Sequence, residues 1–177
     1  AYEELRTFCK ANGVSASALT SAAFGLTVGI YTNQTESLFS TLYHGRDDKT
    51  KNIVGMFVKT LPVYLRWSGD KKILELLQEL TAQIKTSRAN DIYSFADVNK
   101  ICPMKGKPLF AYHGNVRTHS EICGKPCEEK FLDKSATGDA LEIEVMNSEA
   151  GLNVQVHYDG GKYSEQFIET FIRCYEN

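Results

Sequence analysis

The sequence predicts an α/β sandwich, with helices packed on a mixed β-sheet, and three observations lead to this prediction. Two internal stretches repeat apolar residues at the spacing of one helical face. Apolar runs between and after these stretches are typical of strands. Near the C-terminal end, two alternating runs precede an amphipathic stretch, which indicates a hairpin followed by a helix. Such a mixture of elements packs as layers around one core.

The first of these helices is expected to begin after Ser15. The Ser15 hydroxyl can accept hydrogen bonds from the free N–H groups of the first turn, and Val14 and Leu19 can form a hydrophobic staple around this cap. The face expected to pack on the sheet consists of Leu19, Ala22, Ala23, Leu26 and Ile30.

Two strands are expected next. Residues 37–43 form one candidate. Residues 53–61 are apolar on both faces, as expected of a strand that is covered on both sides. Pro62 has no N–H group to donate, so regular pairing is expected to weaken at this residue.

A second helix is predicted with Asp70 as its N-terminal cap. Its apolar face consists of Ile73, Leu76, Leu77, Leu80 and Ile84, and its solvated side carries Lys71, Glu75, Glu79 and Lys85. Residues 109–116 are then predicted to form a further strand.

The C-terminal part is predicted to form an antiparallel hairpin and a helix. Residues 141–145 and 152–158 alternate apolar with polar side chains, and residues 147–151 make a connection of hairpin length. This alternation places Glu142, Glu144 and His157 on a solvated face. After Ser164 as cap, the inward residues of the last helix are Phe167, Ile168, Phe171, Ile172 and Tyr175. Residues 123–139 are the most loop-like segment.

Composition limits the classes of function. The 177 residues suit one domain or large subdomain, and 42% hydrophobic and 24% charged residues lie near the globular average. With 20 basic and 22 acidic residues and no long basic block, the chain is not expected to bind nucleic acid. No apolar run reaches the length of a membrane span and the N-terminus has no signal-peptide pattern, so we expect a cytoplasmic protein. The chain lacks an initiating Met and stops while an amphipathic helix is still expected to run, so we expect it to be a piece of a longer polypeptide.

Histidines and cysteines do not form a recognisable reactive site in the sequence. His113, His119, Cys123 and Cys127 are spaced too loosely for a structural zinc site, so no metal is predicted. No local signature links a cysteine to a histidine base, and the five scattered cysteines are expected to be reduced thiols. Two of them, Cys9 and Cys174, are expected to pack within helices. No nucleophile elbow, phosphate-binding loop or dinucleotide fingerprint is present.

One motif is specific. Gly45-Arg46 is followed, after a charged loop, by residues 53–66 with the sequence IVGMFVKTLPVYLR. This pattern resembles the C-terminal half of the condensation domains of nonribosomal peptide synthetases, which carries Gly-Arg and then V-G-x-F-V-N-T-L-P-L-R. The matching residues are Val54, Gly55, Phe57, Val58, Thr60, Leu61, Pro62, Leu65 and Arg66. The order of the other elements fits as well, so the resemblance covers residues 1–177.

The resemblance implies a domain built from two similar halves, each like chloramphenicol acetyltransferase in fold, with the active site in the tunnel between them. In the family, the amine of an aminoacyl group on one carrier protein attacks the thioester of a peptidyl or acyl group on another, and both groups are carried on phosphopantetheine arms. The implied partners are the N-terminal half, carrier proteins and an adenylation domain of the same synthetase, and no cofactor is expected to bind this half directly.

The family's catalytic signature, His-His-x3-Asp-Gly, belongs to the N-terminal half. This chain has four histidines, none of them in a His-His pair or followed by Asp-Gly, so no catalytic residue is predicted and the isolated fragment is expected to be inactive. Its implied role is a tunnel wall, with apolar area exposed toward the partner half. The tunnel residues implied by position are Gly45, Arg46, Gly55, Phe57, Lys59 and Thr60.

Three of these positions raise specific questions. Gly55 offers a place without a side chain where a chain or backbone can approach closely. Arg46 can either pair with a carboxylate of the absent half or cap a loop. Lys59 stands where the family usually has Asn, and its ammonium group must reach water, a carboxylate or the tunnel.

Other functions fit the same sequence. One class is an epimerisation or heterocyclisation domain, or an acyltransferase of the same fold that uses coenzyme A. A different class is a noncatalytic docking module for a carrier protein.

Overall fold

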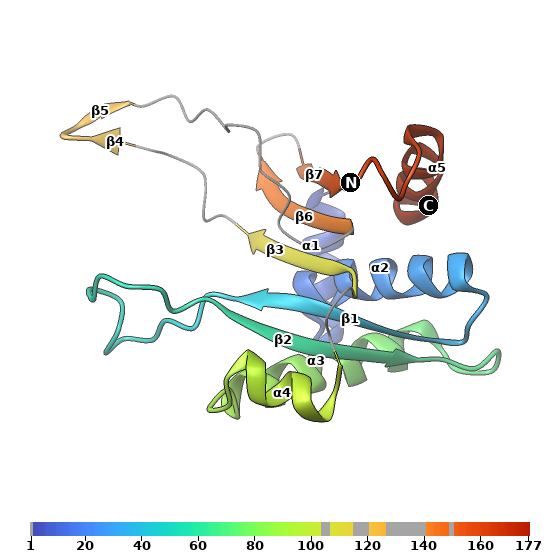
Figure 1. The fold of residues 1–177 in the computed structure, drawn as a ribbon, viewed down its shortest axis with the longest axis horizontal. Helices are drawn as coiled ribbons and strands as arrows, with labels where there is room; N and C mark the ends of the chain where they lie inside the picture. Colours follow the sequence, from blue (N-terminus) through green and yellow to red (C-terminus); the bar gives the residue numbers. More distant parts are fainter. Residues whose placement is uncertain (1, 104–106, 115–120, 127–140, 149–150) are drawn as a thin grey trace.

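The computed structural model describes residues 2–103, 107–114, 121–126, 141–148 and 151–177. Within them the chain forms a five-stranded mixed sheet with helices packed on it, which confirms the predicted α/β class (Figure 1). The elements are α1 (Tyr2–Asn12), α2 (Ala16–Thr32), β1 (Glu36–Tyr43), β2 (Lys59–Arg66), α3 (Ile73–Ala89), α4 (Phe95–Ile101), β3 (Leu109–Gly114), β4 (Glu121–Ile122), β5 (Lys125–Pro126), β6 (Leu141–Ser148), β7 (Gly151–Tyr158) and α5 (Glu165–Glu176).

The strand order of the sheet is β2-β1-β3-β6-β7. β1 pairs antiparallel with β2 over their whole length, from Glu36 opposite Arg66 to Tyr43 opposite Lys59. β3 runs parallel to β1 on one side and to β6 on the other, and β6 and β7 form the predicted antiparallel hairpin. β4 and β5 form a separate two-stranded ribbon.

Helix α2 is the central element of the core. Its Phe24 ring is fully buried and contacts Phe39 of β1, Phe110 of β3 and Phe171 of α5, with ring centroids 5.1, 5.5 and 6.2 Å away. Aromatic pairs at these separations are favourable beyond the burial of their surface. One side chain therefore joins a helix, two strands and the C-terminal helix.

The face of α2 that is buried differs from the predicted one. Ser15 caps the helix as expected, with its Oγ accepting from the N–H of Ala18 at 3.0 Å. The predicted face was wrong at Ile30, which is exposed, whereas Gly25 and Gly29 lie so close to the sheet and to Trp67 that a Cβ would clash with side chains. The small residues that share this side are Ala18, Ser21, Ala22, Gly25 and Gly29. The packed face is thus rotated by one residue, about 100°, because small side chains allow a closer approach.

Helix α3 begins later than predicted. Lys72, not Asp70, occupies the N-cap position, and its side chain makes no cap hydrogen bond. Ile73 is exposed, but the rest of the predicted apolar face is buried. Those buried residues are Leu76, Leu77, Leu80 and Ile84. The segment before the helix turns at Ser68, whose carbonyl accepts from the N–H of Lys71, and this turn delays the first helical residue.

The prediction of a buried strand over residues 53–61 was wrong. Residues 53–58 form no strand, and their large apolar side chains are exposed apart from Phe57, which is half-buried. The strand begins at Lys59 and continues to Arg66, with Leu61, Val63 and Leu65 alternating inward. A strand with one buried face obeys the period of two, and this alternation begins only after residue 58.

Pairing does not weaken at Pro62, which lies opposite Ser40 within an unbroken ladder. β2 is an edge strand, and two residues further on the side-chain amide of Gln83 accepts from the N–H of Tyr64 at 3.1 Å and donates to its carbonyl at 2.8 Å. The backbone groups of Pro62 point to the same free side, because the direction of these groups alternates along a strand. A missing N–H there costs no ladder bond, and Gln83 covers the next free pair of groups.

The hairpin is confirmed, but its second face is not solvated as predicted. Glu142 and Glu144 are 5% and 4% exposed, and His157, opposite Glu142, has a buried Nε2. β6 is an interior strand, so side chains of β3 and β7 flank both glutamates; His113 Nε2 of β3 lies 3.5 Å from a carboxylate oxygen of Glu144. The alternation of polar and apolar residues in the sequence therefore wrongly predicted that Glu142 and Glu144 are exposed to solvent.

The two other predicted strands are present. Residues 37–43 are confirmed as a strand, and residues 109–116 are confirmed as a strand up to residue 114, where the described range ends. Ser164 caps α5 as predicted, and Ile168 and Phe171 are buried. In the part of the chain that is described, four cysteines are free, with Cys9 and Cys174 in helices; residues 127–139 lie outside this part.

None of the described helices is long and apolar enough to cross a membrane by itself. Only α1 and α2 taken together have the length and composition of a span, and this pair is bent by 100°.

Replacement of Phe24 tests the core. We expect Phe24→Ala to lower the free energy of unfolding by about 3–5 kcal/mol, because it removes contacts with three elements and leaves a cavity. Phe8→Ala, at an exposed ring on α1, is the matched control and should cost much less. Denaturant unfolding measures both, and equal losses would contradict a core centred on Phe24.

Candidate functional site

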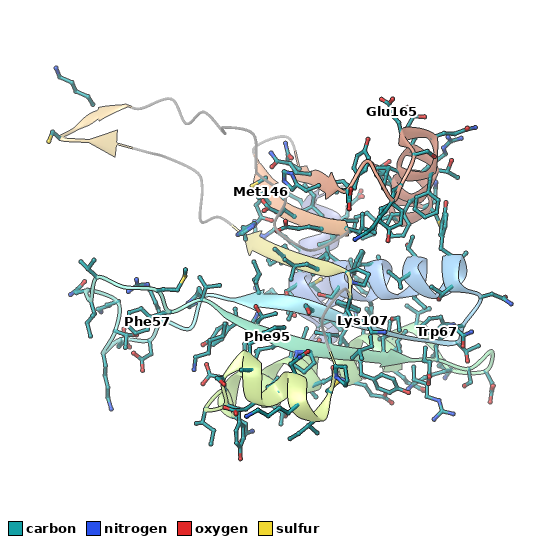
Figure 2. The ribbon with its side chains drawn as sticks, viewed as in Figure 1. Phe57, Trp67, Phe95, Lys107, Met146 and Glu165 are labelled. Atoms are coloured by element: carbon teal, nitrogen blue, oxygen red, sulfur yellow. The ribbon has the colours of Figure 1, made fainter. Side chains whose placement is uncertain are left out.

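The loop of residues 44–58 connects β1 to β2 and projects beyond the sheet (Figures 1 and 2). Its two ends meet where Tyr43 pairs with Lys59. Five of the six residues of the predicted tunnel set lie in this loop or at its end, and the sixth, Thr60, is the second residue of β2. The structure gathers Gly45, Arg46, Gly55 and Phe57 into one cluster, while Lys59 points elsewhere.

Arg46 organises this loop from within. Its Nη1 donates to the carbonyls of Thr50 and Ile53 at 2.9 and 2.7 Å, and its Nη2 donates to that of Gly55 at 2.8 Å. The guanidinium also lies over the Phe57 ring, 4.5 Å from its centroid. A planar group with several donors suits carbonyls that have no partner in a ladder. Of the two roles considered for Arg46, the structure has the loop-capping one.

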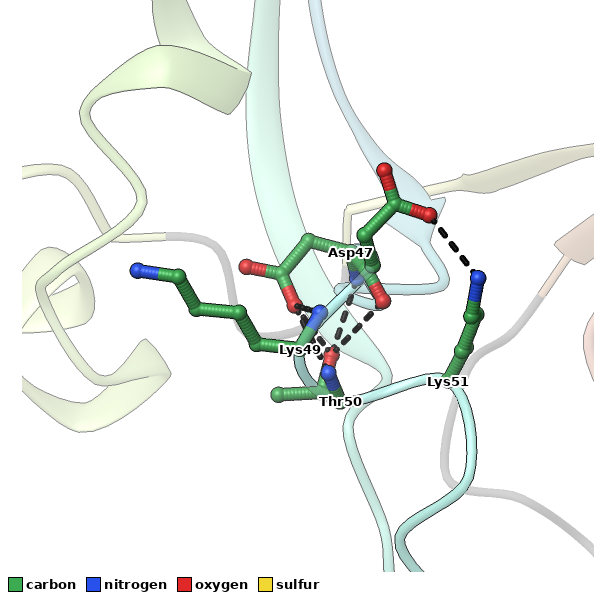
Figure 3. Close-up of polar contacts among 5 residues, drawn as sticks. Asp47, Lys49, Thr50 and Lys51 are labelled. Atoms are coloured by element: carbon green, nitrogen blue, oxygen red, sulfur yellow. Dashed lines mark hydrogen bonds and ion pairs between the residues drawn. The ribbon is translucent and has the colours of Figure 1, made fainter.

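A turn at Asp47 supports the same loop (Figure 3). The Asp47 carboxylate accepts from the N–H groups of Lys49 and Thr50 and from the Thr50 hydroxyl, at 3.0, 2.9 and 2.7 Å. The hydrogen bonds from Thr50 are the main reason why the pKa of Asp47 is below its usual value. Sequence reasoning missed Asp47 and Thr50, although an Asp side chain commonly accepts from the backbone N–H two residues on in a turn.

Gly45 and Gly55 of the predicted set are required to be glycine for different structural reasons. Gly45 has φ +64°, and a Cβ there would lie 2.0 Å from the carbonyl oxygen of Phe57. Gly55 has φ +156°, but its Cβ would meet only the Phe57 ring at 3.6 Å. Gly45 thus closes the base of the loop by close contact, whereas Gly55 meets a backbone requirement and presents a carbonyl to Arg46.

Lys59 reaches a carboxylate, which is one of the three outcomes considered for it. Its Nζ lies 3.2 Å from a carboxylate oxygen of Asp91 and donates to the Asp91 carbonyl. Thr60 lies in β2 opposite Leu42 and is half-buried.

The later part of the loop exposes apolar side chains, namely Ile53, Val54, Met56 and Val58. Its earlier part is charged, since Asp48, Lys49 and Lys51 are exposed. A second group of exposed apolar residues follows α3, and sequence reasoning missed it: Ile92, Tyr93, Phe95 and Ile101. Beside it, a pocket of about 500 Å³ is lined by Tyr93, Asp97, Val98, Lys100, Ile101 and Cys102. Clustered exposed apolar side chains are typical of interaction surfaces.

No metal centre is found among the described residues. Of the four residues considered for zinc, His113 lies beside Glu144 and Cys123 is exposed, while His119 and Cys127 lie outside the described ranges. His44 is also structural, since its Nδ1 accepts from the N–H of Arg46 at 3.0 Å.

Comparison with known proteins gives a consistent result. The family profile described as "Condensation domain" matches residues 1–177. Nonribosomal peptide synthetase ungA' of Aspergillus campestris is 31% identical over 172 residues, which are 93% of this chain and 2% of that protein. Bacitracin synthase 3 of Bacillus licheniformis is 30% identical over 170 residues, 90% of this chain and 3% of that protein.

Solved structures share the fold. The first condensation domain of the CDA synthetase matches with a TM-score of 0.73 and 16% identity, over 97% of this chain and 41% of that one. The epimerization domain from the third module of tyrocidine synthetase B matches with a TM-score of 0.68 and 17% identity, over 95% of this chain and 41% of that one. This chain therefore spans about two fifths of these solved chains and a few per cent of the curated relatives. The resemblance drawn from the motif is confirmed.

Gly45 can be tested against a matched glycine. Gly45→Ala and Gly13→Ala both force alanine to a φ near +65°, which costs roughly 1–2 kcal/mol, but nothing lies within 4 Å of a Cβ at Gly13. We expect only Gly45→Ala to raise amide hydrogen exchange across residues 46–57 as well. Equal exchange in the two variants would contradict the close contact with Phe57.

Arg46→Lys keeps the charge but removes the planar fork. We expect about a tenfold or greater rise in amide exchange over residues 50–57, with β1 and β2 unchanged, because one ammonium cannot reach three carbonyls at once. Arg6→Lys, at an exposed pair with Glu3 on α1, is the control. Unaltered exchange in Arg46→Lys would mean that the loop keeps its shape without the guanidinium.

Proposed function

The chain belongs to the condensation-domain family, and from this premise we propose that residues 1–177 form the C-terminal subdomain of a condensation domain in a nonribosomal peptide synthetase. The parent domain would join an aminoacyl and a peptidyl or acyl group, each held as a thioester on the phosphopantetheine arm of a carrier protein. This half would form one wall of the tunnel in which the two groups meet. The proposed partners are the N-terminal half, carrier proteins and an adenylation domain, in the cytoplasm.

The observation that carries this proposal is the projecting loop. Hydrogen bonds of Arg46 and Asp47 order residues 46–55, while the side chains of Ile53, Val54 and Met56 are exposed. An ordered segment that exposes several apolar side chains is costly in water and is expected where another surface covers it. The solved relatives have more than half of their length beyond the part matched here, which could supply that surface.

The proposed reaction needs little chemistry from this half. The amine nitrogen attacks the thioester carbonyl, a C–N bond forms, the C–S bond breaks, and the thiol leaves with the proton lost by the amine. A histidine of the absent half would handle that proton and steady the tetrahedral intermediate, since this chain has no His-His pair. The wall residues, Gly45, Arg46, Gly55, Phe57, Lys59 and Thr60, would act by shape and position. The isolated fragment is proposed to be inactive.

A second candidate is an epimerisation domain, because a solved epimerization domain has the same fold over 95% of this chain. A heterocyclisation domain, an acyltransferase that uses coenzyme A and a noncatalytic docking module remain alternatives from the sequence. The upstream half separates the enzymes, since its histidine motif is altered in heterocyclisation domains.

The decisive experiment is complementation. The 177 residues alone, the upstream half alone and the two together are assayed with loaded donor and acceptor carrier proteins. We expect amide product only when both halves are present; turnover by the 177 residues alone would contradict the proposal. Inversion at the α-carbon without amide formation would favour the epimerisation candidate.

The loop surface is tested in the same assay. Val54→Asp should weaken association of the halves and lower amide formation about tenfold or more, because it places a charge in an apolar contact. Ile73→Asp, at an exposed apolar residue in the first turn of α3, is the control and should have no effect. Equal behaviour of the two variants would remove the loop from the interface.

A further inference from the structure

A charge pair joins two parts of the chain that are distant in sequence. Lys59 is the first residue of β2, and Asp91 follows the end of α3. Their charged groups are 3.2 Å apart, and the Lys59 ammonium also donates to the Asp91 carbonyl. The pair therefore fixes both the side chain and the backbone of Asp91 against the base of the loop.

This pair differs from the local surface pairs. The pairs Arg6–Glu3, Lys51–Asp48, Lys100–Asp97 and Lys162–Asp159 each join residues three positions apart. The side chains of Lys59 and Asp91 are 38% and 23% exposed, so solvent screens them less than it screens a fully exposed pair. A pair within one turn cannot fix one element against another, whereas Lys59 and Asp91 do.

A second cation contact lies at the same rung of the sheet. Tyr43 pairs with Lys59 across β1 and β2, and the guanidinium of Arg88, near the end of α3, lies 5.1 Å from the Tyr43 ring centroid. Such a contact is favourable. Tyr43 therefore contacts the last turn of α3, and Lys59 contacts the segment that follows it.

Both of the held segments expose apolar side chains. Val58 directly precedes Lys59, and Ile92 and Tyr93 directly follow Asp91. All three side chains are exposed. The charge pair thus sets the position of the apolar group after α3 relative to the apolar surface of the loop.

We infer that Lys59 and Asp91 form a positioning pair that fixes residues 91–95 against the base of the loop of residues 44–58, so that the two exposed apolar segments, 53–58 and 92–95, meet the N-terminal half of the domain in one set arrangement. The inference rests on the proposed function for its effect on turnover. Asn, the usual residue at position 59 in the pattern that this chain resembles, is uncharged and shorter than Lys, so it cannot form the charge pair with Asp91. Lys59 acts through the segment that it holds.

The test is a double-mutant cycle in the full-length protein that carries this chain. Lys59→Asn and Asp91→Asn should each raise amide exchange of residues 91–95 about fivefold to tenfold, and the double variant should be no worse than either. The exchanged pair, Lys59→Asp with Asp91→Lys, should recover part of the protection, because it restores the charge pair but not the hydrogen bond to the carbonyl of residue 91. In turnover, kcat for amide formation should fall by a similar factor while KM for both carrier proteins stays unchanged.

Lys162→Asn, which breaks an exposed pair far from the loop, is the matched control and should change neither exchange nor kcat. Additive single effects, unchanged exchange at 91–95 or no recovery by the exchanged pair would overturn the pairing. Loss of protection with unchanged kcat would overturn the role in positioning. If the wild-type protein forms no amide, the proposed function is wrong and no effect on kcat can be measured. Amide hydrogen exchange at residues 91–95, and its recovery in the exchanged pair, would still test whether Lys59 and Asp91 form a pair.

Discussion

The close packing of α2 on the sheet is the contact on which the other elements depend. Gly25 and Gly29 leave no room for a Cβ, so the helix lies near β1 and β2, and Phe24 can reach rings on two strands and on α5. This contact fixes the two strands whose far ends carry the loop of residues 44–58. The position of the candidate site is therefore set by the packing of a core that contains no predicted functional residue.

The loop shows how a segment without regular structure can still be ordered. The backbone carbonyls of Thr50, Ile53 and Gly55 have no partner strand. The Arg46 guanidinium satisfies them instead, because it donates a hydrogen bond to each of the three. Arg46 hydrogen-bonds within the loop, while the apolar side chains of residues 53, 54, 56 and 58 are exposed. The same arrangement that stabilises the loop creates the apolar surface that we propose to be covered by the rest of the domain.

Electrostatic contacts then connect this loop to the second exposed group. Tyr43 and Lys59 form the last rung between β1 and β2, and each holds a residue from the segment around the end of α3. The edge strand itself is protected on its free side by Pro62 and Gln83. The free side of the sheet edge is thus closed to a further strand at Tyr64.

The sequence by itself determined the features that depend on neighbours within a few residues. These are the caps at Ser15 and Ser164, the β6–β7 hairpin and the motif that names the family, and all were confirmed. Tertiary structure alone decided which side of α2 is buried, that residues 53–58 are an exposed loop, and that Glu142 is buried. Capping and turn rules act locally, whereas burial and charge pairing depend on what the rest of the chain places opposite. Apolar residues 53–58 look like a core strand for that reason, and Lys59 could be recognised as unusual but not matched with Asp91.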